Sequence, residues 1–174
     1  MKPSKRLNIY IATSANRNLH AYLLLRDALT EDGHIIADWS KLPEFPLSPD
    51  MPLEERRERM SRAAYSRVYD FCSQAAASSD LVIYIGPAGQ DAACEVGMAA
   101  NAGVPIYGLR GFFEAPGTIL GRAVTKWFDS PAALLDAVDK LSMDVFVSPF
   151  ADSQTFGAIA DREAKAKREK ATRA

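Results

Sequence analysis

Apolar residues occur along the chain in short dense runs that alternate with longer segments of helical spacing. The two clearest runs, 7–13 and 80–85, are rich in β-branched and aromatic residues, which is typical of buried parallel strands. Weaker runs predict three further strands, at 34–37, 105–109 and 124–128. Helical spacing and terminal signals predict helices at 19–30, 53–78, 92–102 and about 131–141.

Strands that alternate with helices predict the α/β class, because parallel strands need right-handed crossovers that place helices on both faces of the sheet. We expect three α/β/α layers around a five-stranded parallel sheet with the flavodoxin- or Rossmann-like order 2-1-3-4-5. The α/β domain is predicted to span 1–150, followed by a charged C-terminal tail at 151–174. The proline-rich segment 40–52 predicts a loop, and a loop of this length often covers a site.

The amino-acid composition and net charge of the chain exclude several classes of binding partner. The 174 residues fit one globular domain, with 48% apolar and 25% charged residues. A net charge of −1 gives no basic excess for binding long nucleic acid. Two cysteines, Cys72 and Cys94, and two histidines, His20 and His34, fit neither a disulfide framework nor a zinc site. The first apolar run is too short for a signal peptide, and we expect a cytoplasmic protein with no membrane partner.

The predicted topology indicates where a ligand binds. Open parallel sheets bind ligands beyond the carboxyl ends of their strands, where the strand order reverses. Here that point lies between the first and third strands, so 14–18 and 86–91 are the candidate loops. The first loop has no glycine and matches neither the dinucleotide fingerprint nor the P-loop. It offers one cation, Arg17, for a single phosphate, and neutral hydrogen-bonding side chains at Thr13, Ser14, Asn16 and Asn18. Alternatively, Ser14 or Asn18 caps the next helix and Arg17 is solvated.

The second loop carries the stronger signal. Gly86 and Gly89 permit close approach of backbone to a ligand, or a tight turn, and Gln90 follows them. The next helix is expected to begin near Asp91, as its N-cap, and to point free N–H groups at the same space. Glu95 then falls in about the first turn, on an otherwise apolar face. It acts in a site, or it only complements the helix dipole.

Three segments resemble the nucleoside 2-deoxyribosyltransferase superfamily. They are Ile9-Tyr-Ile-Ala-Thr-Ser-Ala-Asn-Arg-Asn, Ser79-Asp-Leu-Val-Ile-Tyr-Ile and Gly89-Gln-Asp-Ala-Ala-Cys-Glu-Val-Gly-Met-Ala-Ala-Asn-Ala-Gly-Val-Pro. The third is the most specific, since it is similar to the family pattern E-[LV]-G-x-A followed by G-[KV]-P. The resemblance covers about 7–140. Met98 stands where many of the transferases have tyrosine or histidine.

The resemblance implies an activity and a set of roles. Glu95 matches the family's nucleophilic glutamate, and Asp80 matches an aspartate near the sugar. Arg17 and Asn18 occupy the positions that hold the phosphate in relatives that take nucleotides. The implied reaction is double displacement at the N-glycosidic bond of a small-molecule nucleoside or nucleotide, with no metal and no cofactor. A homo-oligomer is implied as well, because related proteins complete the site with residues of a neighbouring subunit.

Several alternatives stay open at this point. Asp80 sits by the sugar or closes a turn, and Asp38 accepts from a ribose hydroxyl or caps its loop. Trp39 and Phe45 stack on a base or pack within the protein. A nucleotide sensor of the same fold, without catalysis, is the alternative function. A Rossmann-type phosphoribohydrolase is less favoured, because no arginine lies in the segment around Glu95.

Overall fold

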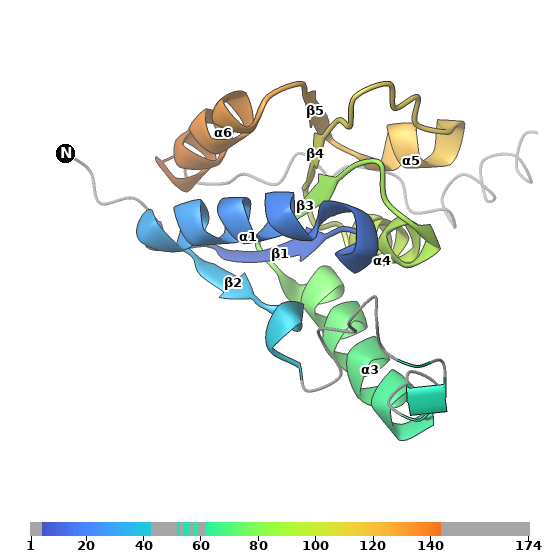
Figure 1. Cartoon of the computed structure of the whole chain (residues 1–174). Coiled ribbons are helices and arrows are strands. Elements are labelled where there is room, and N and C mark those ends of the chain that lie inside the picture. The colour runs from blue at the N-terminus through green and yellow to red at the C-terminus, as the bar shows by residue number, and fades with distance from the viewer. Residues whose placement is uncertain (1–4, 43–51, 53, 56–57, 59–61, 144–174) are drawn as a thin grey trace, which may run out of the picture. The chain divides into compact units, whose positions relative to one another are not determined.

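A single parallel sheet organises the molecule. The computed structural model describes residues 5–42, 52, 54–55, 58 and 62–143 (Figure 1). The strands are β1 (Asn8–Ala12), β2 (Ile35–Ala37), β3 (Leu81–Ile85), β4 (Ile106–Leu109) and β5 (Lys126–Phe128). All pairings are parallel, and the order is β2-β1-β3-β4-β5. The predicted class, sheet and strand order are therefore confirmed.

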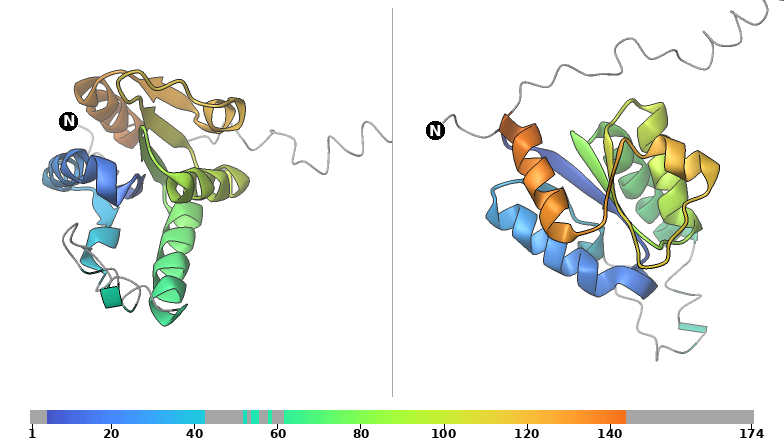
Figure 2. Two further views of the ribbon diagram at one scale, coloured as in Figure 1. Left: turned by 45° about the vertical axis from the view of Figure 1, so that its right-hand side comes forward. Right: turned by 90° about the horizontal axis from the view of Figure 1, so that it is seen from above.

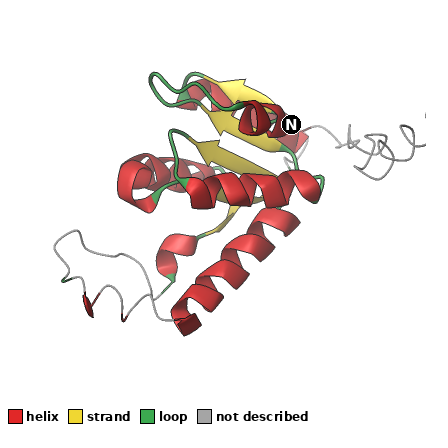
Figure 3. Ribbon diagram, turned by 90° about the vertical axis from the view of Figure 1, so that its right-hand side faces the viewer, coloured by secondary structure: helices red, strands yellow, loops and turns green. Residues whose placement is uncertain are grey.

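Helices flank this sheet. They are α1 (Ala15–Glu31), α3 (Arg62–Ser78), α4 (Gln90–Asn101), α5 (Thr118–Ala123) and α6 (Pro131–Met143), with a short 3-10 helix η1 (Trp39–Lys41). Helices α1 and α6 cover one face, and α3 and α4 cover the other (Figure 2). The strands lie between them in Figure 3 as well. This arrangement gives the three expected layers.

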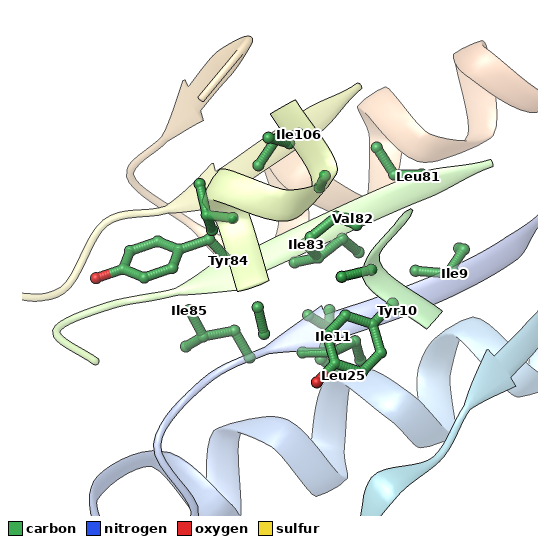
Figure 4. Close-up of a cluster of buried hydrophobic side chains, with 14 of the residues drawn as sticks. Ile9, Tyr10, Ile11, Leu25, Leu81, Val82, Ile83, Tyr84, Ile85 and Ile106 are labelled. Carbon is green, nitrogen blue, oxygen red and sulfur yellow. The ribbon is translucent and has the colours of Figure 1, made fainter. Parts of the chain in front are cut away.

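The centre of the core is the pair β1 and β3. All five residues of β3 are buried, and Tyr10 of β1 lies in register with Val82 of β3. Figure 4 shows side chains of the two strands together with Leu25 of α1 and Ile106 of β4. Burial of each large apolar side chain stabilises the fold by roughly 1.5–3 kcal/mol. The apolar runs seen in the sequence therefore form the part of the sheet next to the switch point.

Two helix starts differ from the sequence prediction. Helix α1 begins at Ala15, and its backbone is kinked at Asn18 (φ −123°, ψ 18°), immediately before the predicted start. Helix α4 begins at Gln90 with Gly89 as its N-cap, so the prediction that Asp91 is the N-cap is wrong. The carbonyl of Gly89 already accepts from the N–H of Ala93, which places Asp91 inside the first turn. Consequently Glu95 lies in the second turn.

Several predicted segments lie partly or wholly outside the residues that the structure describes. Of the predicted helix 53–78, the structure describes α3 and the helical positions 54–55 and 58. Most of the predicted loop 40–52, including Phe45, lies outside the described residues, as does the tail 151–174. Helix α5 was not predicted. Within the described ranges, no helix combines the length and the apolar character needed to cross a membrane.

Candidate active site

Glu95 lies where three elements meet. Helix α4, which carries it, packs against α3 and against β1 and β3. Tyr10 on β1 and Cys72 on α3 lie near enough to its carboxylate to affect its ionisation. The side chain is largely enclosed, yet the residue keeps some contact with solvent. A largely enclosed carboxylate thus lies beside the switch point of the sheet, near side chains from a strand and from a neighbouring helix.

The surroundings of Glu95 alter its acidity. Burial raises the pKa of the carboxyl to about 7, and the negative charge of Asp91 acts in the same direction. Hydrogen bonds from Tyr10 and Cys72 lower the pKa and offset part of this effect. Near neutral pH the carboxyl is therefore divided between its neutral and ionised forms. A carboxyl perturbed in this way by burial and specific neighbours is a candidate for chemistry.

The two donors stay protonated at neutral pH. Burial is the main cause that raises the pKa of Tyr10, followed by the charge of Glu95. Burial also raises the pKa of the Cys72 thiol to about 11, with a further contribution from the charge of Glu95. Both groups therefore carry a proton to donate when Glu95 is ionised. Neither Tyr10 nor Cys72 was among the site residues predicted from the sequence, because their proximity to Glu95 arises only in the folded chain.

The loops after β1 and β3 are joined by side-chain hydrogen bonds. The hydroxyl of Thr13 donates to the carbonyl of Ile85 at 3.0 Å. The amide nitrogen of Asn18 lies 3.1 Å from Thr13 Oγ1, 3.1 Å from the carbonyl of Ile85 and 3.0 Å from the carbonyl of Pro87. Thr13 and Asn18, both predicted to bind substrate, are thus brought together with the second loop, and they hold the two loops in place.

Ser14 and Arg17 lie at the start of α1. Ser14 occupies the N-cap position, but its side chain makes no capping hydrogen bond. Its carbonyl accepts from the N–H groups of Arg17 and Asn18. The Arg17 side chain is exposed. Both residues follow the carboxyl end of β1, the edge at which the topology predicts a ligand.

Gly86 is buried against the carboxylate of Glu114, a residue that was not among those predicted from the sequence. A Cβ at this position would overlap with the carboxylate of Glu114. That carboxylate accepts from Tyr84 Oη at 2.7 Å and from the N–H of Gly111 at 2.9 Å. Burial, and then the bond to Glu114, raises the pKa of Tyr84 to about 12. Glycine is therefore required here for contact within the protein, because Glu114 fills the space above it.

Gly89 and Gln90 are more open. Apart from Gly89 itself and its two chain neighbours, no residue has an atom within 4 Å of the position that a Cβ would take at Gly89, and both Gly89 and Gln90 are exposed. They begin α4, whose first turn also holds Asp91. Of the two glycines in this loop, Gly89 thus has free space beside it, whereas the corresponding space at Gly86 is filled. Ligand approach is thus easier at Gly89 than at Gly86.

Asp80 lies at the opposite end of β3 from these loops. It directly precedes the first residue of the strand, and its carboxylate accepts from the N–H of Asn8 at 2.9 Å and from Lys5 Nζ at 3.2 Å. Burial alone would raise its pKa, but these partners lower it below the usual value. Asp80 is not among the groups that shift the pKa of Glu95. The carboxylate of Asp80 is thus bonded to other groups of the protein at the edge of the sheet where β1 and β3 begin.

Asp38 is held in a polar network at the end of β2. Its partners are Tyr22 Oη at 2.7 Å, the N–H and hydroxyl of Ser40, Arg26 Nη1 at 3.4 Å and Lys41 Nζ at 3.5 Å. Burial opposes ionisation of Asp38, yet the hydrogen bonds and cations hold its pKa below the usual value. The adjoining Trp39 is buried, and its Nε1 donates to the carbonyl of Ile11 at 3.0 Å. This network supports the capping and packing interpretations of the two residues.

In the part of the chain that the structure describes, no three acidic, histidine or cysteine side chains gather as a metal site would require.

The protein is a doubly wound α/β protein with a largely enclosed carboxylate beside the strands at which the sheet order reverses. Its fold is similar to that of the 2-deoxyribosyltransferase from the psychrotolerant bacterium Bacillus psychrosaccharolyticus. The TM-score is 0.52 at 15% identity, over 73% of this chain and 89% of that chain. A CMP N-glycosidase from Clostridium botulinum matches with a TM-score of 0.49 at 17% identity, over 77% of this chain and 98% of that chain.

No family model and no curated protein sequence matches the chain. The likeness to the Bacillus transferase is therefore one of fold. At that level it agrees with the fold that the resemblance of the sequence segments implied. Fold alone does not define an activity, which must be argued from the site.

Proposed function

We propose that the protein cleaves the N-glycosidic bond of a nucleoside or nucleoside monophosphate, with Glu95 as the nucleophile. The observation that carries this proposal is the largely enclosed Glu95 carboxyl, which lies near the switch point of the sheet and whose pKa is raised by burial to about 7. The 2-deoxyribosyltransferase fold supports it. The match of 89–105 to the family pattern around its nucleophilic glutamate supports it as well.

The reaction proceeds in two displacements. Ionised Glu95 attacks the anomeric carbon, the C–N bond breaks, and the base leaves with the electron pair and takes up a proton. The transition state resembles an oxocarbenium ion, and the product is a glycosyl ester of Glu95. Water, or a second base, then attacks the anomeric carbon from the opposite face and restores the carboxylate. Water makes the protein a hydrolase, and a second base makes it a transferase.

Binding groups surround this centre in the proposal. Arg17 is exposed at the carboxyl edge of β1 and supplies the cation for a 5′-phosphate. The open space at Gly89 and Gln90 admits the ligand beside the N-terminus of α4. Asp80, which the resemblance places near the sugar, is engaged with Asn8 and Lys5 and takes no step in this scheme.

Release of free base tests the proposal. The full-length protein is incubated with ribo- and deoxyribonucleosides and their monophosphates, with and without an acceptor base. The wild type is compared with Glu95→Gln, and with Glu31→Gln, an exposed carboxylate at the end of α1, as the matched control. We expect Glu95→Gln to lose release by at least about 10³-fold, because no attacking oxygen anion remains, while Glu31→Gln keeps it.

Mass spectrometry separates the outcomes further. A 2-deoxy-2-fluoro nucleoside, which slows the second displacement, is expected to leave a glycosyl adduct on the peptide that contains Glu95. Dependence of release on the acceptor base identifies a transferase. Binding of nucleotides without any release would contradict the proposed activity and would establish the sensor function instead.

We also propose that copies of the protein associate, as the resemblance implies. Phe112 and Phe113, in the connection between β4 and α5, are 87% and 93% exposed, and Ile119 of α5 is 88% exposed. Exposed large apolar side chains of this kind are common at protein interfaces. Light scattering after size-exclusion chromatography tests the association. A monomer at all concentrations would contradict it.

A further inference from the structure

The loop after β4 is bonded to the end of β3 through the carboxylate of Glu114. One carboxylate oxygen, Oε1, accepts from Tyr84 Oη at 2.7 Å, and the other, Oε2, accepts from the N–H of Gly111 at 2.9 Å. Tyr84 is a buried residue of β3, and Figure 4 shows its ring extending away from the labelled side chains of β1. Glu114 thus uses one oxygen to hold its own loop and the other to hold the neighbouring strand.

The hydrogen bonds continue from Glu114 to the backbone that leads into α4. The hydroxyl of Tyr84 accepts from the N–H of Ala88 at 3.2 Å. A hydroxyl has one proton, and this proton goes to Glu114, because an ionised carboxylate only accepts. Ala88 directly precedes Gly89, the N-cap of α4. We call Tyr84, Ala88, Gly111 and Glu114 the Glu114 network, in which Glu114 acts on Ala88 through the Tyr84 hydroxyl.

The same loops pack closely around two glycines. A Cβ at Gly86 would overlap with the carboxylate of Glu114, and a Cβ at Gly111 would overlap with Pro87. The carbonyl of Pro87 in turn accepts from the side-chain amide of Asn18 at 3.0 Å. The loops after β1, β3 and β4 are therefore in contact at the carboxyl edge of the sheet, where the topology predicts a ligand.

The turn that Glu114 closes is conformationally strained. The N–H of Glu114 donates to the carbonyl of Gly111 at 3.0 Å, so Phe112 and Phe113 occupy the centre of a β-turn. Phe113 has a φ of 65°, in the left-handed region that bulky side chains disfavour. Such residues persist where surrounding contacts hold them, often beside a functional site. The bond between the Glu114 carboxylate and the N–H of Gly111 is a contact of this kind.

We propose that Glu114 is a positioning residue for the candidate active site: its carboxylate holds the loop after β4 against the loop after β3 and, through Tyr84, fixes the backbone that begins α4. The catalytic meaning of this role rests on the proposed function, in which the ligand enters beside Gly89 and Gln90. The bonds themselves do not. Loops that are held in one arrangement keep the binding-competent state populated, so the ligand does not have to order them.

The competing interpretation is that Glu114 only stabilises the fold, as other side chains that bond to the backbone do. The two interpretations differ in the kinetic parameters that they predict. A purely structural loss lowers the Tm and leaves KM and kcat of the folded protein unchanged. Loss of loop positioning raises KM, because the ligand must then order the loops as it binds. It leaves kcat nearly unchanged, because the loops are ordered again in the complex.

Hydrogen exchange of backbone amides, measured by NMR in the full-length protein, tests the network directly. We expect Glu114→Ala to speed exchange about tenfold at Gly111, which loses its acceptor, and at Ala88, at the far end of the network. Thr125→Ala is the matched control, since it removes a side-chain acceptor of a backbone N–H where β4 begins. It should leave both exchange rates unchanged. Unchanged exchange at Ala88 in Glu114→Ala would overturn the proposal.

Base release and ligand titration supply the second readout, with ribo- and deoxyribonucleosides and their 5′-monophosphates as probes. We expect KM, or Kd where no base is released, to rise about five- to tenfold in Glu114→Ala, with kcat within about twofold of the wild type. Tyr84→Phe is expected to have the same effect. The double variant should bind no worse than either single variant, because the two residues act as one unit.

Two further variants separate the hydrogen bonds from packing. Glu114→Gln keeps the size of the side chain and one acceptor oxygen, so its KM should fall between those of Glu114→Ala and the wild type. Tyr107→Phe removes a hydroxyl from the neighbouring strand β4, outside the Glu114 network, and should leave KM unchanged. A KM that rises equally in Tyr107→Phe and Tyr84→Phe would contradict the role of the network.

The two proposals fail in different ways. If the wild type binds a probe but releases no base, the activity is refuted, and a higher Kd in Glu114→Ala still supports positioning. If base is released through Glu95 but KM is the same in Glu114→Ala and the wild type, the activity stands and the positioning role is refuted. If no probe binds, the activity is refuted, and the exchange rate at Ala88 decides whether Glu114 positions the loop. Thermal melts establish that each variant is folded.

Discussion

Asp91 and Glu95 lie one turn apart on α4, and the charge of exposed Asp91 raises the pKa of the enclosed Glu95 carboxyl. Residues four apart are neighbours on a helix surface, so like charges there oppose each other. Asp91 is in the first turn, where the helix dipole favours a negative charge, whereas Glu95 is deeper and loses solvation. One helix thus carries an exposed carboxyl in its first turn and, in its second turn, a largely enclosed one whose pKa is raised.

Replacing Asp91 tests this coupling. Asp91→Asn removes the like charge, so we expect the pKa of Glu95 to fall and the rising limb of the base-release profile to move to lower pH. Asp139→Asn, at an exposed aspartate on α6, is the control and should leave the profile in place. If the rising limb of the pH profile moves equally in both variants, or in neither, the proposed effect of the Asp91 charge on Glu95 is contradicted.

Glu95 also makes stability depend on pH. Its folded pKa of about 7 lies above the ordinary value of 4.5, so between these values the unfolded chain has lost a proton that the native protein keeps. The free energy of unfolding therefore declines as pH rises from about 4.5 to 7, by about 3 kcal/mol for this one group. The loss levels off at higher pH.

Glu95→Gln removes that dependence. The variant is expected to match the wild type near pH 4.5 and to exceed its stability by up to about 3 kcal/mol at pH 8, because the amide carries no charge to bury. Urea unfolding at both pH values measures the difference. A variant that is less stable than the wild type at pH 8 would show that the hydrogen bonds to the carboxylate outweigh its burial.

The bonds of Asn18 predict a second stability effect. Asn18→Ala leaves the carbonyls of Ile85 and Pro87 without this donor, and we expect a loss of about 1–3 kcal/mol in the free energy of unfolding. Asn101→Ala, at the exposed end of α4, is the matched control. Chemical denaturation compares the two variants, and equal stabilities would refute the structural role assigned to Asn18.

A double-mutant cycle tests the contact between Gly86 and Glu114. Gly86→Ala places a methyl group where the Glu114 carboxylate lies, and displacing that carboxylate breaks its bonds to Tyr84 and Gly111. We expect Gly86→Ala to cost about 1–3 kcal/mol in the wild type and less in Glu114→Ala. Strict additivity of the two changes, measured by denaturation, would contradict the overlap.

Much of the fold was predictable because its signals are local. The apolar runs of β1 and β3 predict buried parallel strands, and the handedness of crossovers limits the possible strand orders. Boundaries were less certain: α1 was predicted from Leu19, directly after the kink at Asn18, where the side chain bonds to the loops instead of lying along a regular helix. Helix α5 was missed because it has six residues and none is buried, so it leaves no apolar stripe.

The candidate site was only partly predictable. Glu95 could be singled out because a carboxylate on an apolar helical face conflicts with its surroundings. Cys72 and Glu114 could not, since each meets its partners across layers or loops that are distant in sequence. For Asp38 and Asp80 the sequence leaves two roles open, because an acidic residue at a strand end has the same sequence signature whether it binds a sugar or the protein's own backbone.

The hydrogen bonds from Thr13 and Asn18 have a consequence for ligand recognition. These bonds join the loops after β1 and β3 when the protein folds. The two loops therefore lose their conformational entropy during folding, before any ligand binds. Loops that are preorganised in this way favour rapid ligand binding with little rearrangement of the backbone. Selectivity must then come from side chains outside this pair of joined loops, such as the exposed Arg17 side chain.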